Sequence, residues 1–183
     1  MSSIYRADTV PELLKQGLDE APAIGAPERP SLTHKSLREL AMRTVQSLNA
    51  MGIGRGDRVA IVLPNGPEMA AAFIVIACGA TTAPLNPAYR AEEFDFYLSD
   101  LNAKALVIQD GMESPARAIA AARNIPIVTL LRGETAGDFT LKADGMTAAP
   151  AQPASPRPTI SRWCCTHRAP PRGPRSCLCP RPT

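Results

Sequence analysis

The sequence has few aromatic residues and no hydrophobic run long enough to cross a membrane. A transmembrane helix needs about 20 consecutive apolar residues, and no stretch of this 183-residue chain approaches that length. The N-terminus also lacks the apolar core of a secretion signal. These absences predict a cytoplasmic protein without a membrane span. The length is enough for one domain with a hydrophobic core, followed by a tail.

Cysteine is scarce before the last twenty residues, which hold four of the five cysteines of the chain. Acidic residues show the opposite distribution, because none of the 17 lies beyond Arg157. The segment that starts at Arg157 contains six arginines and carries +6, so the rest of the chain carries −3. The overall net charge of +3 therefore describes neither part. It gives no reason to expect a nucleic-acid partner.

The clustered cysteines raise the question of a zinc site that includes His167. Zinc-binding cysteine pairs are usually separated by two to four residues. Here Cys164 and Cys165 are adjacent, and Cys177 and Cys179 are one residue apart in a proline-rich setting. The spacing argues against a metal site. A basic tail that contacts phosphate or nucleic acid is a slightly better alternative, although almost no aromatic residue is present to stack on bases.

Before this tail, segments typical of helices alternate with segments typical of strands. Thr33 and Ser114 are expected to cap helices, and Asn65 with Glu68 is expected to form a capping box. Residues 21–30, rich in Pro, Gly and Ala, are expected to form an irregular connector. The alternation predicts βαβ units and a parallel, Rossmann-like sheet. The expected helices are 10–19, 34–51, 67–79, 91–102 and one after Ser114; the expected strands are 58–63, 81–85, 104–108 and 127–131.

Residues 57–100 carry a family resemblance as well as the clearest alternation. They contain DRVAIVLPNGPEM and then TTAPLNPAYRAEEFDFYLSD. These strings resemble the N-terminal part of the AMP-forming acyl-CoA synthetases, and the oxalate–CoA ligase branch in particular. The resemblance covers about residues 8–145. It implies that the chain is the first part of the large N-terminal α/β domain of an adenylate-forming enzyme.

The resemblance also implies a reaction. Such an enzyme activates a carboxylic acid with ATP to an acyl-adenylate and then transfers the acyl group to coenzyme A, with Mg²⁺ accompanying the nucleotide. Oxalate is the first choice of acid, and a medium- or short-chain fatty acid is the second. Nothing in the sequence indicates a nucleic-acid partner or a membrane span.

The tail has a second meaning when its codons are read one base earlier. Each shifted codon joins the last base of one codon to the first two bases of the next. The codons of Trp163 and Cys164 then encode Val, and those of Cys164 and Cys165 encode Leu. The codons of Cys165 and Thr166 allow only His or Tyr. Taken from Pro158 to Thr183, every overlap permits the string DDIALVLHTSGTTSRPKIVPLSQAN. This string resembles the phosphate-binding loop of the same synthetases, and it falls where that loop is expected. We infer a single-base frameshift between about Ala148 and Thr159, in the gene or in its sequence record.

The frameshift removes the groups that would bind ATP. Backbone N–H groups, hydroxyls and a basic residue surround the phosphates in such loops. By resemblance, the aspartate that holds the ribose and the lysine that assists adenylation lie further downstream. We therefore expect no catalytic, cofactor-binding or metal-binding residue, no bound ATP, coenzyme A or Mg²⁺, and no activity. The expected organisation is a partial AMP-binding-type domain (1–145), an Ala/Pro linker (146–158) and a disordered, out-of-frame tail (159–183).

Two residues of the body are candidates for ligand binding. Tyr89 and Arg90 end a loop that follows an expected strand, and ligands of open α/β sheets bind beyond the carboxyl ends of strands. A structural turn is the preferred interpretation of both residues, because loop position alone is weak evidence for ligand binding. Cys78 is expected to be a small core residue and His34 a surface residue. As an alternative to an inactive truncation, the chain is a binding module that pairs its sheet edge with an intact synthetase.

Overall fold

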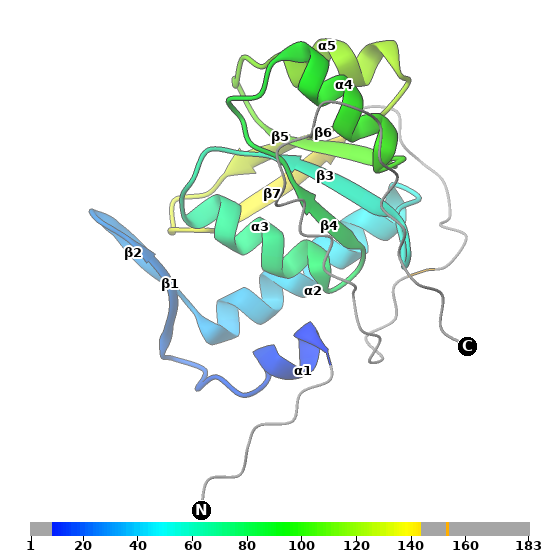
Figure 1. The fold of residues 1–183 in the computed structure, drawn as a ribbon. Coiled ribbons are helices and arrows are strands. Elements are labelled where there is room, and N and C mark those ends of the chain that lie inside the picture. Colours follow the sequence, from blue (N-terminus) through cyan, green and yellow to red (C-terminus); the bar gives the residue numbers. More distant parts are fainter. Residues whose placement is uncertain (1–8, 144–152, 154–183) are drawn as a thin grey trace, which may run out of the picture.

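The computed structural model describes residues 9–143 and residue 153, and in this range helices cover both faces of a five-stranded sheet (Figure 1). The expected linker and tail, with the alternative zinc site, lie outside the described residues apart from residue 153. The helices are α1 (Val10–Leu14), α2 (His34–Ala50), α3 (Pro67–Ala77), α4 (Ala91–Asp100) and α5 (Pro115–Ala122). The strands are β1 (Pro22–Ala26), β2 (Arg29–Thr33), β3 (Arg58–Val62), β4 (Thr81–Pro84), β5 (Ala105–Gln109), β6 (Ile127–Arg132) and β7 (Phe139–Ala143).

The large sheet has the strand order β4-β3-β5-β6-β7. Its first four strands are parallel, which confirms the predicted class, and β7 pairs with β6 in the antiparallel direction. No strand was predicted at β7, which is therefore an addition to the expected fold. Among the described residues, no helix is both long and apolar enough to span a bilayer.

The central strands are buried on both faces, which explains their nearly unbroken apolar sequences. Side chains of a strand alternate between the two faces of a sheet. In β3, Val59 and Ile61 belong to the core that includes α2 and α3, whereas Ala60 and Val62 belong to the core that includes α4 and α5. Figure 1 shows α4 and α5 together on one side of the sheet and α2 and α3 on the other.

Most helices begin and end close to the predicted positions. Thr33 caps α2 by accepting a hydrogen bond from the backbone N–H of Ser36 at 3.2 Å, and Ser114 caps α5 in the same way. Phe94, Tyr97 and Leu98 of α4 are buried as their helical spacing predicts. The prediction for α2 needs one change, because Thr44 is buried while Val45 stays partly exposed.

The predicted irregular connector is wrong, because its residues belong to the antiparallel hairpin β1–β2. The chain turns at Glu28, whose φ of 61° lies in the left-handed region. Proline, glycine and arginine within the two strands hid the β pattern in the sequence. The hairpin is held by contacts from Arg29 to distant segments, which no local pattern reveals.

The predicted capping box at Asn65 is also wrong. The residue before α3 is Gly66, which makes no side-chain cap, and the carboxylate of Glu68 bonds to other segments. The first helix ends at Leu14, earlier than predicted. Beyond it, Gly17 lies against His34, where an added Cβ would stand 2.2 Å from Nδ1. His34 is consequently half-buried rather than on the surface, and Nδ1 has no hydrogen-bond partner among the described residues.

Candidate functional site

The order of the strands places a topological switch point between β3 and β5. From β3 the chain passes through α3 to β4 on one side, and it then crosses through α4 to β5 on the other side. Ligands of open α/β sheets bind outside the carboxyl ends of the strands at such a point. The loops that follow β3 and β5 are therefore the first place to look for a site.

The loop after β3 leads to the N-terminus of α3, where the buried side chain of Glu68 lies. Glu68 Oε1 accepts a hydrogen bond from Arg29 Nη1 at 2.6 Å and from the backbone N–H of Gly137 at 3.4 Å. Arg132 Nε stands 3.7 Å from the same oxygen. The partial positive charge at the N-terminus of α3 also stabilises a carboxylate in the first turn.

The surroundings of Glu68 favour its charged form. Burial alone would raise the pKa of this carboxyl group, but the hydrogen bonds from Arg29 and from backbone N–H groups outweigh burial and lower the pKa. Glu68 is therefore an ionised carboxylate already surrounded by donors, a poor general base and a poor neighbour for a phosphate.

The loop after β5 is closed by Arg117 of α5. Its Nε donates to the backbone oxygen of Met112 at 2.9 Å, and its Nη2 donates to that of Gln109 at 3.0 Å. Two of its nitrogens therefore hold the loop to the start of α5. Glu68 and Arg117 thus make contacts within the fold that hold the loops at the switch point in place.

Tyr89 and Arg90, the two predicted candidates, lie at the start of α4. The ring of Tyr89 stacks on Tyr97 with centroids 5.1 Å apart and meets Phe94 edge-on at 5.8 Å. Burial, followed by the hydrogen bond with Tyr97, raises the pKa of Tyr89. Arg90 is exposed, and its backbone N–H donates to Glu93 at 2.9 Å. These contacts are those of a structural turn, and ligand binding by either residue stays a prediction.

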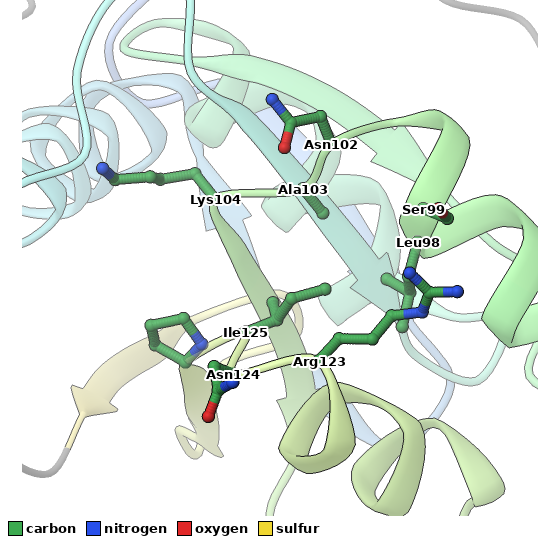
Figure 2. Close-up of a pocket in the computed structure, with 9 residues that line it drawn as sticks. Leu98, Ser99, Asn102, Ala103, Lys104, Arg123, Asn124 and Ile125 are labelled. Carbon is green, nitrogen blue, oxygen red and sulfur yellow. The ribbon is translucent and has the colours of Figure 1, made fainter.

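A hollow of about 460 Å³ lies at the opposite, N-terminal ends of β5 and β6. Figure 2 shows Asn102 and Asn124 on the two helix-to-strand loops that border it. Both residues have positive φ, 45° and 55°, because each ends a helix in the left-handed conformation. Arg123 faces Asp95 at 2.6 Å. The negative ends of two helix dipoles, those of α4 and α5, meet here, and the basic residues near them balance this charge.

The remaining candidates for chemistry are weak. Within residues 9–143 no cluster of His, Cys, Asp and Glu could hold a metal ion. Cys78, predicted as a core residue, is half-buried at the end of α3 and packs against the core. Burial raises the pKa of its thiol to about 12, so the sulfur stays protonated and is a poor nucleophile.

Comparison with known proteins identifies relatives of most of the described region. Residues 15–167 match the family described as AMP-binding enzyme. The oxalate–CoA ligase of Arabidopsis thaliana is 37% identical over 140 residues, which is 74% of this chain and 27% of the relative. A probable CoA ligase, CCL9, of Humulus lupulus is 46% identical over 99 residues, 54% of this chain and 19% of that protein.

Solved structures agree with these sequence matches. The apo structure of MatB from Rhodopseudomonas palustris superposes with a TM-score of 0.60 at 25% identity, over 76% of this chain and 30% of MatB. The ATP-bound structure of MatB superposes with a TM-score of 0.61 at 24% identity, which shows a similar fold. This chain therefore spans about a fifth to a third of the length of the proteins that it resembles.

Proposed function

The chain belongs to the AMP-binding enzyme family, and on this premise we propose that it is the N-terminal portion of an AMP-forming acid–CoA ligase. The main support is the match over 140 residues to an oxalate–CoA ligase. The intact enzyme would join a carboxylate to ATP, releasing pyrophosphate, and the coenzyme A thiol would then displace AMP. Oxalate is the proposed acid. A fatty acid is the alternative, since the long-chain-fatty-acid–CoA ligase FadD13 of Mycobacterium tuberculosis is 35% identical over 100 residues.

The described residues supply the scaffold in this proposal. Strands β3 to β6 form a parallel sheet, flanked by helices, whose carboxyl edge would face the nucleotide. The donors for ATP, its Mg²⁺ and coenzyme A would come from the part of the domain that follows residue 145. The out-of-frame string TSGTTSRPK supports this assignment, because it supplies the hydroxyls and the lysine that a phosphate loop requires.

We expect the purified 183-residue chain to show no acid-dependent ATP–pyrophosphate exchange. The physical reason is that Glu68 and Arg117, the charged groups at the switch point, are already committed to structural contacts. The measurement is exchange of labelled pyrophosphate with oxalate or with octanoate, beside an intact ligase of the family as a positive control. Exchange above background in the 183-residue chain would overturn the proposal.

One observation favours a binding module as the second candidate. The face of β6 that carries Ile127, Thr129 and Leu131 is only partly covered, and within residues 9–143 β7 pairs with β6 alone. An open edge can accept a further strand from another chain, and a partly covered face can be packed against by other elements of that chain. Co-purification of the 183-residue chain with a full-length relative supports the module, whereas rapid degradation and aggregation support an inactive truncation.

A further inference from the structure

Exposed apolar side chains gather around the two N-terminal helices. Leu13 in α1, Leu18 after it and Met42 in α2 are three of the four large hydrophobic residues that are exposed in the described chain. Between α1 and α2 lies a groove of about 630 Å³. This volume is within the range of small-molecule sites, about 300–1,000 Å³.

The floor of the groove is apolar. It is formed by Leu14, Ala41, Met42 and Val45, and Cys78 also lines the groove. The raised pKa of Cys78 keeps this sulfur uncharged, so the floor carries no charge at neutral pH. Val45 lies at a position where the helical pattern predicts burial, yet nothing in the described chain covers it fully. Such a floor favours an alkyl chain.

The walls of the groove are held in place by Arg38. Its Nη1 donates to the backbone oxygens of Leu14 at 3.1 Å and Gly17 at 3.3 Å, and its Nη2 pairs with Asp19. One side chain of α2 thus fixes both the end of α1 and the turn that follows. These bonds satisfy the charge of Arg38, so it is not available to a ligand.

The rim near Arg38 carries the free charges. Lys15 follows Leu14, whose carbonyl is bound to Arg38, and Lys35 lies one helical turn before Arg38. Neither lysine forms an ion pair within the described residues. Glu39 is the one acid on the rim that also lacks an ion pair there. The unpaired groups therefore leave a net positive rim at one end of an apolar groove.

We propose that the α1–α2 groove binds a linear alkyl carboxylate. The alkyl chain lies on the floor along Ala41, Met42 and Val45, and the carboxylate lies between Lys15 and Lys35. The site is separate from the carboxyl edge of the sheet, where the acid to be activated would react. It is therefore an accessory site for a single-chain amphiphile, and its existence does not depend on the ligase proposal.

The test is calorimetric titration of the 183-residue chain with dodecanoate, and with dodecan-1-ol as a chain-matched neutral ligand. The Lys15→Gln/Lys35→Gln double variant should bind dodecanoate roughly five- to tenfold more weakly, as expected for two exposed charge contacts. Binding of dodecan-1-ol should not change. Equal losses for both ligands, or no loss for dodecanoate, would overturn the proposed position of the carboxylate.

A second pair of variants tests the floor. Met42→Glu places a carboxylate in the groove and should weaken dodecanoate binding at least about tenfold. Phe96→Glu is the matched control, because Phe96 is 51% exposed in α4 and Met42 is 59% exposed in α2. Both positions are exposed, so both variants should fold. If Met42→Glu binds dodecanoate as tightly as the wild-type chain, or if Phe96→Glu loses as much affinity as Met42→Glu, dodecanoate adsorbs to the protein surface and the groove is not its site.

Discussion

Restoring the reading frame between the codons of Ala148 and Thr159 should yield an active acid–CoA ligase from a chain that we expect to be inactive. On our hypothesis, the restored gene would encode TSGTTSRPK and then the remainder of the domain. Backbone N–H groups, hydroxyls and a lysine would then surround the triphosphate at the switch point. We expect acid-dependent ATP–pyrophosphate exchange of the order of 1–10 per second, within the common range of enzymes, against background for the 183-residue chain.

Two controls accompany the restored gene. Replacing its Ser-Gly-Thr-Thr segment by four alanines should abolish exchange while leaving the fold intact, which separates the loop from the added length of chain. Comparison of oxalate with octanoate identifies the acid. If resequencing finds no reading frame that encodes such a loop, the inferred frameshift is wrong. If a restored, folded protein shows no exchange with any acid, the proposed ligase activity is wrong.

Removing the Glu68 carboxylate should destabilise the fold more than any exposed charge change. Glu68 joins three segments, because it binds Arg29 of the hairpin, belongs to α3, and accepts from Gly137 in the β6–β7 turn. Arg29 also donates to the backbone oxygens of Gly133 and Thr135, each at 2.9 Å. In Glu68→Ala the partly buried Arg29 loses its counter-charge. We expect a loss of about 2–3 kcal/mol in the free energy of unfolding.

Urea denaturation followed by circular dichroism measures this loss. Arg43→Ala is the control, since its pair with Asp138 at 3.0 Å is largely exposed; it should change stability by less than about 1 kcal/mol. If Glu68→Ala and Arg43→Ala lose equal amounts, Glu68 does not join the three segments energetically.

The lowered pKa of Glu68 adds a pH dependence to the same experiment. A carboxyl group whose pKa is lower in the folded state contributes stability above its unfolded pKa, and it loses this contribution as pH falls through the folded pKa. The difference in stability between the wild-type chain and Glu68→Gln should therefore be largest at neutral pH. It should shrink below the ordinary glutamate range. A difference that stays constant or grows on acidification would contradict an ionised Glu68.

The sequence predicted the elements whose apolar pattern is strong and local. The runs at β3 and β5 are buried on both faces, and Thr33 and Ser114 cap helices through neighbouring N–H groups. The hairpin β1–β2 was not predicted, because it is held by hydrogen bonds from Arg29 to backbone oxygens about a hundred residues away in the sequence. Strand β7 escaped for a related reason, since its five residues gain their conformation by pairing with β6.

The candidate site was predicted less well than the fold. Tyr89 and Arg90 were singled out from loop position, whereas their contacts are internal to the turn and to α4. Glu68 was assigned to a local cap, but its carboxylate binds a side chain 39 residues away in sequence. Periodicity reports which face of an element is buried. It does not report which charged groups meet across the fold.

The antiparallel direction of β7 decides where the next segment of a restored chain would arrive. Ala143 stands opposite Val128, so β7 returns the chain to the amino-terminal edge of the sheet, away from the switch point. In the recovered string, two aspartates precede the apolar run IALVLH, and the phosphate loop follows it. A strand formed by that run, parallel to β6, would carry the chain back across the sheet and release the loop at the carboxyl edge. Because β7 runs antiparallel to β6, one further strand parallel to β6 is enough to bring the phosphate donors to the edge beside β3 and β5.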